Sequence, residues 1–353
     1  MTTTRAASRV PLPPAADVSG TSLLSTDAPD ATALLLADPS PALRYRVLTE
    51  IMDVRRDDTE AADLDRRRRR LPGIRELLDT ETVDLKALSW ALCRLAYLRV
   101  DRRHPGVRRL AERVFARQLP DGSFPLSAFT PGERPSRYSM IPLQVSLPLR
   151  GLAAAGYATD PRAERAYDWL LAQRLEDGAW PLGEASGQPG YIAGYRKLPG
   201  SAGCRVNTEA AVACLVLHPR RRRSEPTRHA LDLLLQRETR DEWALGTEVA
   251  RLVGVEPAEG FVTFYARFDL AFVLELASRA GASAEDARVA GLVDFLRARR
   301  GPAGLWEHPS HPELARWLTF DILVSLRRLD AGDWVGVAPR VPFRAYRPRL
   351  RRH

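Results

Sequence analysis

Tryptophan recurs at a fixed distance along this chain, and the repeat constrains the fold more than any other feature. Trp180, Trp243 and Trp306 are each separated by 63 residues. The residues seven positions before them are Gln173, Gln236 and Arg299. A shorter version upstream places Phe124 six residues after Gln118 and 56 residues before Trp180. A fixed period of this kind indicates stacked, equivalent structural units.

Two kinds of predicted helix alternate from residue 83 onward. The strongly apolar segments are 83–98, 142–156, 207–218, 264–281 and 315–329. The amphipathic segments are 106–118, 161–173, 225–236 and 286–299. A helix that is apolar most of the way round must be covered on most sides, whereas an amphipathic helix faces solvent on one side. We therefore expect an all-α fold, an α/α toroid with two concentric layers and about five to six helix pairs; an open solenoid is the competing geometry.

Composition changes at both ends of the chain. Residues 1–26 are rich in Thr, Ala, Pro and Ser and predict a disordered extension. A single toroid domain is expected over residues 27–335, with order established by the helix that starts at Ser40 and Pro41. A basic tail, 336–353, follows and holds six arginines from residue 340 onward. Because the net charge is +9, the rest of the chain carries only 9 − 6 = +3, so we expect no specific nucleic-acid partner.

The sequence also bears on the compartment. No run of eighteen uncharged apolar residues occurs, and the first residues lack the apolar core of a secretory signal. The three cysteines, Cys93, Cys204 and Cys214, are too few for a disulfide framework. We therefore expect a cytoplasmic protein. For the tail, a solvated end is the default, and contact with an anionic membrane surface is the alternative.

The segments around the repeated aromatic residues resemble a known family. DWLLAQRLEDGAW and VFARQLPDGSF are similar to the QW repeat of the squalene–hopene cyclase and protein prenyltransferase superfamily, whereas LLLQRETRDEW lacks the glycine and FLRARRGPAGLW lacks the glutamine. The resemblance covers residues 83–330. It implies an α/α toroid that binds an isoprenoid or other apolar molecule in a central cavity. It also implies that the motif residues are structural.

The catalytic motifs of that superfamily are absent from the sequence. There is no Asp-x-Asp-Asp tetrad, no cysteine has an aspartate two positions before it, and no Cys-Cys-His zinc site can be assembled. We expect no metal and no cofactor. The leading hypothesis is a terpenoid-cyclase-like or prenyltransferase-like protein, with acid-initiated cyclisation as its reaction. The alternatives are a non-catalytic toroid that binds a ligand or a protein, and a carbohydrate-active α/α barrel with two carboxylates about 5–10 Å apart.

Two aspartates interrupt apolar helices next to an aromatic residue. Asp269 and Asp321 both occur in a Phe-Asp-aliphatic sequence. A carboxyl group in an apolar cavity tends to stay protonated, which suits a general acid. The competing interpretation is a buried ion pair with a nearby arginine. The neighbouring residues expected to contact a ligand are Tyr265, Arg267, Phe268, Arg316, Trp317 and Phe320.

A glycine-rich connection precedes the apolar segment 207–218. Residues expected to meet a polar or anionic ligand there are Tyr191, Tyr195, Arg196 and Arg205. Long loops at the mouth of a ring collect binding residues, although a plain connection is the alternative. Farther along the chain, His308 and His311 have a spacing that can bind metal. The prolines that follow them indicate a turn instead.

Overall fold

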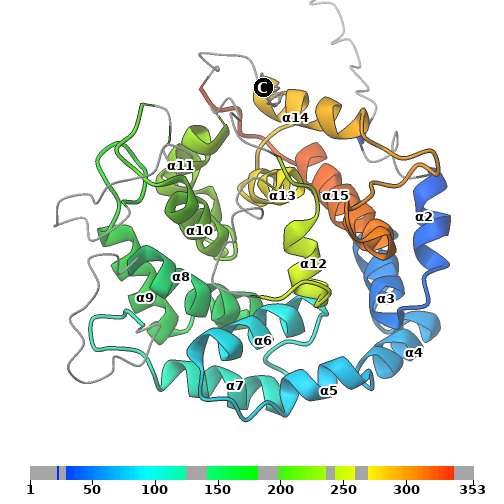
Figure 1. Ribbon diagram of the computed structural model, residues 1–353, viewed down its shortest axis with the longest axis horizontal. Helices are drawn as coiled ribbons and strands as arrows, with labels where there is room; N and C mark the ends of the chain where they lie inside the picture. The colour runs from blue at the N-terminus through cyan, green and yellow to red at the C-terminus, as the bar shows by residue number, and fades with distance from the viewer. Residues whose placement is uncertain are drawn as a thin grey trace, which may run out of the picture.

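The computed structural model describes residues 22–23, 29–124, 141–181, 198, 200–235, 243–258 and 269–337. Within these ranges helices account for the regular secondary structure, and β contacts are limited to isolated bridges. Figure 1 shows the helices in two concentric layers around a common centre, so the fold is the expected α/α toroid. No helix in these ranges is long and apolar enough to cross a membrane.

The two layers alternate along the chain (Figure 1). The inner layer contains α3 (Pro41–Glu50), α6 (Leu85–Tyr97), α8 (Ile141–Leu152), α10 (Arg205–Leu215), α13 (Leu270–Arg279) and α15 (Ala315–Asp330). The outer layer contains α2 (Pro29–Leu36), α4 (Thr59–Arg68), α5 (Pro72–Leu78), α7 (Pro105–Phe115), α9 (Pro161–Ala172), α11 (Glu225–Leu235) and α14 (Ala287–Arg297). Short turns of helix are η1 (Ala153–Tyr157), η3 (Arg221–Arg223) and η5 (Pro312–Leu314). Every residue of α10 is buried, as expected for an inner helix.

Several helices begin at a capping position that is followed by proline. Asp160 caps α9 by accepting a hydrogen bond from the Arg162 N–H, and Pro161 occupies the first helical position. Proline is favoured there because it has no N–H to leave unsatisfied and its φ is already helical. Ser40 and Pro41 take the same positions in α3, as predicted, although the Ser40 side chain makes no capping bond.

The ring is closed by contacts between the two ends of the described chain. Helix α15 packs against α2 and α3. Asp330, the last residue of α15, accepts hydrogen bonds from the Ser22 hydroxyl (2.6 Å) and the Leu23 N–H (2.8 Å). Arg327 donates to the Glu50 carbonyl at 2.7 Å. An open solenoid has no contact of this kind between its first and last repeats.

Two of the repeated tryptophans make the same set of bonds. The indole N–H of Trp180 donates to the Leu170 carbonyl, and that of Trp306 to the Leu296 carbonyl, both at 2.7 Å. Each backbone N–H donates to a threonine hydroxyl on the next inner helix, Thr208 for Trp180 (3.0 Å) and Thr319 for Trp306 (2.9 Å). Both tryptophans are fully buried. The repeat therefore fastens each outer helix to the inner helix that follows.

The long side chain that braces each turn stands six residues before the aromatic. The Gln118 amide donates to the Gly122 carbonyl (3.0 Å), four residues ahead. The guanidinium Nε of Arg174 reaches Gly178 (3.4 Å) and that of Arg300 reaches Gly304 (2.9 Å) in the same way. Arg174, and not Gln173, is thus the equivalent of Gln118. The seven-residue spacing read from the sequence is offset by one residue from the spacing that the contacts define.

A short helix, α12 (Thr247–Val253), lies inside the ring, where it contacts α6 and α15 (Figure 1). Its buried residues include two charged ones, Glu248 and Arg251. Glu248 accepts hydrogen bonds from Arg150 of α8 (2.6 Å) and from Arg251 (3.1 Å). The Arg251 guanidinium stacks over the Trp90 ring of α6, 4.2 Å from its centre. The interior of the toroid is therefore partly filled by a helix held through charged side chains.

We expect Trp180→Ala to lower the free energy of unfolding by about 3–5 kcal/mol, because a fully buried indole and its hydrogen bond are both lost. Trp243 is the matched control, since it has the same place in the repeat but is only partly buried. Its ring meets Phe295 edge to face and lies beneath Arg299. Trp243→Ala should cost less than half as much in urea denaturation. Equal losses would contradict the fastening role of Trp180.

Candidate functional site

A cavity of about 220 Å³ lies among the inner helices. Its lining comes from α3, α6, the α8–η1 junction, the end of α10, α12 and α13. The polar lining residues are Arg46, Tyr97, Arg99, Arg150, Glu275 and Arg279, and the others are Cys93, Ala96, Ala153, Ala154, Leu217 and Leu252. These residues lie in the last two turns of their helices or directly after them. We call this space the central cavity.

Arginine occupies the last turn of several inner helices. Arg150 ends α8, Arg279 ends α13, and Arg327 and Arg328 lie in the last turn of α15. The carboxyl end of a helix carries a partial negative charge and unpaired carbonyls, which favour a cation in that turn. Because the carboxyl ends of these helices meet at the central cavity, their arginines gather around it.

Carboxylates partly balance these arginines. Glu50 pairs with Arg46 (2.9 Å) and with Arg99, and Glu275 pairs with Arg279 (2.8 Å). Cations still outnumber carboxylates: the group contains Arg46, Arg99, Arg150, Arg251, Arg279 and Arg328 against Glu50, Glu248, Glu275 and Asp321. Burial lowers the pKa of Arg328 to about 9, and the nearby Arg279 adds to the fall.

Arg46 is the most enclosed of the cations that line the central cavity. Its side chain is 6% exposed, and its guanidinium lies between the rings of Tyr97 and Phe320, 4.3 and 4.4 Å from their centres. It also lies 3.6 Å from the Asp321 carboxylate. Its Nη1 is buried and makes no hydrogen bond with the described residues. A buried donor of this kind is rarely left without an acceptor.

Asp321 lies behind Tyr97 and does not line the cavity itself. The Tyr97 hydroxyl donates to Asp321 Oδ2 at 2.9 Å, and 15% of the aspartate side chain is exposed. Burial raises the pKa of Asp321 to about 7; Glu275 adds to the rise, and Arg46 opposes it. Glu275 shows the opposite shift: burial would raise its pKa, but Arg279, Arg328 and Arg150 lower it. Two carboxyl groups with opposite shifts are suited to acid and base roles.

Asp269 was predicted to be an acid in the cavity, but it caps a helix instead. It is fully buried and caps α13 through the Ala271 N–H (3.1 Å). It also accepts from Gly246 N–H (3.0 Å) and Glu248 N–H (2.8 Å) at the start of α12. Burial raises the pKa of Asp269 to about 6 against these hydrogen bonds. Its oxygens are occupied by backbone donors, so Asp269 serves to anchor α12 on α13.

The other predicted residues lie away from the central cavity or outside the described residues. Arg205 is buried in the first turn of α10, at the end opposite the cavity. Arg316 pairs with Asp38 (3.5 Å), so it is not the partner of Asp321. Trp317 packs on Tyr97, with ring centres 5.7 Å apart, and Phe320 lies beneath Arg46. Outside the described residues are Tyr191, Tyr195, Arg196, Tyr265, Arg267 and Phe268.

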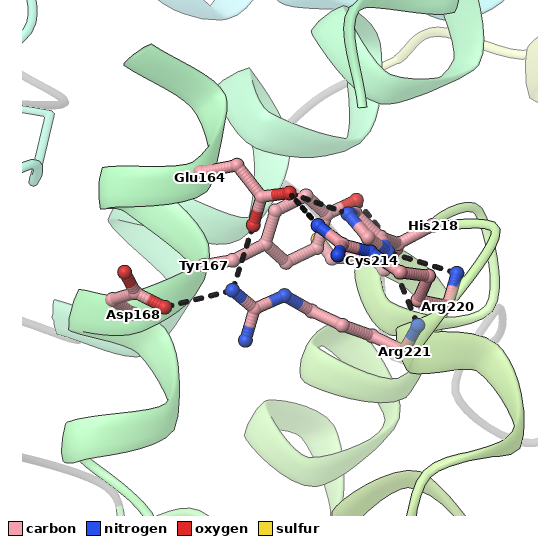
Figure 2. Close-up of polar contacts among 7 residues, drawn as sticks. All are labelled: Glu164, Tyr167, Asp168, Cys214, His218, Arg220 and Arg221. Atoms are coloured by element: carbon pink, nitrogen blue, oxygen red, sulfur yellow. Dashed lines mark hydrogen bonds and ion pairs between the residues drawn. The ribbon is translucent and has the colours of Figure 1, made fainter. Parts of the chain in front are cut away.

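A second polar cluster in the outer part of the ring includes a buried histidine (Figure 2). His218 Nε2 bonds Glu164 at 2.9 Å, and Arg221 bridges Glu164 and Asp168 at 2.7 Å each. The other ring nitrogen, Nδ1, accepts from the backbone N–H groups of Arg220 and Arg221, both at 3.1 Å. Because both ring nitrogens are engaged, this cluster ties α9 to the turn after α10 and leaves no nitrogen for catalysis.

His308 and His311 also form a turn. His308 Nδ1 accepts from the Ser310 and His311 N–H groups, both at 3.1 Å. Glu256 Oε1 lies 3.8 Å from His308 Nε2 and 3.5 Å from His311 Nε2. Over the residues that the structure describes, no group of three side chains is placed to hold a metal ion.

The lining of the central cavity was largely missed by the sequence reasoning. Arg46, Tyr97, Arg150, Glu275 and Arg279 come from four helices and have no shared motif. The available signal is the basic residue in the last turn of successive apolar helices, which can be read from the sequence once the helix boundaries are known.

Comparisons with known proteins show only distant likenesses. No protein-family model and no curated protein matches the chain. Among solved structures, a protein from Actinoplanes is 17% identical, with 85% of this chain and 88% of that chain covered and a TM-score of 0.41. The type II terpene cyclase MstE from Scytonema is 13% identical, with 87% and 97% covered and a TM-score of 0.44. A variant of that cyclase in complex with geranylgeranyl dihydroxybenzoate has 14% identity, 85% and 86% coverage and a TM-score of 0.40. At these values the likenesses assign neither a function nor a site.

We expect Asp269→Ala to destabilise the protein by roughly 3 kcal/mol or more, because three backbone N–H groups lose their acceptor in the core. Asp84→Ala is the control, since Asp84 is an exposed cap of α6 that accepts a single bond from Lys86. It should cost about 1 kcal/mol. Urea denaturation compares the two, and similar losses would argue against the anchoring role.

Asp321 should make the protein less stable as the pH rises from about 4 to about 7. In this window the unfolded carboxyl, with its ordinary pKa of 3.8, loses its proton, whereas the folded one, with a pKa of about 7, keeps it. The folded state then binds more protons, so stability falls with pH. Asp321→Asn is always neutral and should gain about 2–4 kcal/mol over the wild type across the window. The exposed Asp294→Asn should show no such trend in urea denaturation.

Proposed function

We propose that the protein binds a small molecule with an anionic group, such as a phosphate, diphosphate or carboxylate, in the central cavity. The observation that carries this proposal is the excess of arginine around a half-open cavity among the inner helices. Arg46, Arg150 and Arg279 line the cavity, and Glu275 is the single carboxylate among the described lining residues. An excess of cations over carboxylates in a poorly solvated site is costly, and an anionic ligand offsets that cost.

The buried Nη1 of Arg46 supports the same interpretation. Guanidinium groups present planar donors that match the oxygens of carboxylates and phosphates. Arg46 is already fixed by Glu50 and by two aromatic rings, so its remaining donor is held in place before a ligand arrives. A donor fixed in advance binds its acceptor with little further loss of conformational freedom.

Size and the apolar part of the lining restrict the ligand further. A volume of about 220 Å³ is below the roughly 300–1,000 Å³ of pockets that take drug-sized ligands. Ala96, Ala153, Leu217 and Leu252 provide a short apolar wall. Of the isoprenoids that the repeat resemblance implies, a short chain with a diphosphate meets both conditions. A large uncharged isoprenoid such as squalene offers nothing for the arginines to bind.

Proton transfer is a second candidate function, favoured by the pair of carboxyl groups. Tyr97 lines the cavity and is the group that would touch a ligand, while Asp321 behind it holds a proton near neutral pH. Glu275, in the cavity wall, is the ionised member of the pair. Protonation of a bound alkene or activation of a bound hydroxyl both fit such an arrangement. The carbohydrate alternative needs two carboxylates facing each other, which the described lining does not provide.

The proposal predicts that dimethylallyl diphosphate binds and that dimethylallyl alcohol, which lacks the anionic group, does not. Isothermal titration calorimetry would measure both. Arg279→Gln should weaken diphosphate binding by about tenfold or more, because a charge-assisted hydrogen bond is lost. Arg220→Gln removes an 83% exposed arginine of the outer layer and should leave the affinity unchanged.

Equal binding of the alcohol and the diphosphate, or no binding of either, would overturn the proposal. For the proton-transfer candidate, mixtures with the diphosphate are analysed for new products by mass spectrometry. Asp321→Asn should abolish any product while leaving diphosphate affinity within about twofold, since the aspartate does not line the cavity. Retained turnover in this variant would exclude Asp321 as the proton donor.

A further inference from the structure

A second cavity, of about 370 Å³, adjoins the central cavity. Arg99, Ala96 and Ala154 line both of them. The remaining walls come from α3, α4, the connection between α6 and α7, and η1. The charged lining residues are Arg56, Arg68, Arg69, Arg99 and Arg103 on one side and Glu50, Asp65 and Asp101 on the other. Cations therefore exceed carboxylates by 5 − 3 = 2.

The three carboxylates already have partners. Glu50 lies between Arg46 and Arg99. Asp65 pairs with Arg68 and Arg69. Asp101 Oδ1 accepts from the backbone N–H of Arg103 at 2.9 Å. In contrast, the exposed side chains of Arg56 and Arg103 make no ion pair with any described residue. The excess positive charge thus lies on side chains that are open to a ligand.

Arg68 provides a buried donor in this cavity. The residue is 2% exposed, and its guanidinium lies 4.6 Å from the centre of the Tyr45 ring. Nη1 donates to the Leu98 carbonyl (2.8 Å), whereas Nε has no acceptor among the described residues. Burial lowers the pKa of Arg68. Burial, together with Arg69, Arg109 and Arg108, also lowers the pKa of His104 in the same wall. Of the two shifts, the one of His104 includes repulsion by neighbouring arginines.

Arg99 has an unusual backbone conformation for its residue type. Its φ is +63°, in the left-handed region that favours glycine. It follows α6 in the position where the Val100 N–H returns to the Leu95 carbonyl (2.8 Å). Glycines hold the corresponding left-handed position after α12 and α13, at Gly254 and Gly281. A side chain in this conformation costs about 1–2 kcal/mol, so Arg99 keeps its guanidinium between the two cavities at a conformational cost.

We propose that the second cavity binds a phosphate or diphosphate group through Arg99, Arg68 and the exposed Arg56 and Arg103. Several guanidinium groups around one space suit an anion with several oxygens and more than one charge. The site does not depend on the function proposed for the central cavity. A soluble phosphate compound and a lipid phosphate headgroup share this chemistry, and the experiment separates them.

The probes are inorganic pyrophosphate, followed by calorimetry, and vesicles of phosphatidylcholine with and without phosphatidic acid, followed by co-sedimentation. Arg103→Gln and Arg56→Gln should each weaken binding by about tenfold, and neither disturbs an ion pair of the fold. Arg66→Gln is the matched control, because Arg66 lies on α4 outside the cavity with a 63% exposed side chain. It should bind like the wild type.

Arg279→Gln separates this site from the central cavity, since Arg279 does not line the second one. Pyrophosphate binding that survives Arg279→Gln but not Arg103→Gln supports the second site, even if dimethylallyl diphosphate fails to bind the central cavity. Binding of pyrophosphate assigns a soluble ligand, and binding only of phosphatidic acid vesicles assigns a headgroup. Binding of neither probe, or equal binding by the wild type and Arg103→Gln, would overturn the proposal.

Arg99→Gly tests the residue with the left-handed backbone. Glycine relieves the conformational cost, which offsets the lost ion pair with Glu50, so the melting temperature should change by only a few degrees. Pyrophosphate affinity should nevertheless fall by about tenfold or more. Arg99→Lys, which keeps the charge, should retain part of the affinity. Unchanged affinity together with a large fall in melting temperature would show that Arg99 is only structural.

Discussion

The convergence of inner helices at their carboxyl ends is the constraint on which the rest of this structure depends. A ring of helices that run in the same direction brings several partial negative charges and unpaired carbonyls to one side. Arginines in the last turns of α8, α13 and α15 balance these partial charges. Two of these arginines, Arg150 and Arg279, are in turn paired with Glu248 and Glu275. The chemistry of the central cavity therefore follows from the geometry of the ring.

The architecture could be predicted from the sequence because its signals are local. Apolar and amphipathic helices alternate along the chain, and Trp180 and Trp306 make the same bonds in their respective units. Which long side chain braces the turn before each aromatic residue was harder to predict. Arg174 and Arg300 do what Gln118 does because each only has to reach a carbonyl four residues ahead. Glutamine and arginine are both long enough for this contact. The position of the glutamine in the sequence therefore does not identify the bracing residue.

The candidate site was harder to predict because its residues meet only after the ring closes. Asp321 and its aromatic neighbours were identified from one helix, but Arg46 and Tyr97, which surround it, come from two others. Asp269 has the same local sequence as Asp321, yet it begins its helix and so becomes a cap. Whether such an aspartate faces backbone donors or a cavity depends on the position of the helix boundary, which a Phe-Asp-aliphatic pattern does not fix.

Helix α12 fills part of the interior and is held by other contacts than those that join the helices of the ring. The described hydrogen bonds of Trp180 and Trp306, which fasten outer helices to inner ones, do not involve residues 247–253. Helix α12 is held instead through Glu248, Arg251 and the capping carboxylate of Asp269. Sequence change in this one segment can alter the size and charge of the interior while the circumference stays as it is. The ring and the helix that fills it are thus held by largely different bonds, so we expect substitutions in α12 to change the interior before they change the ring.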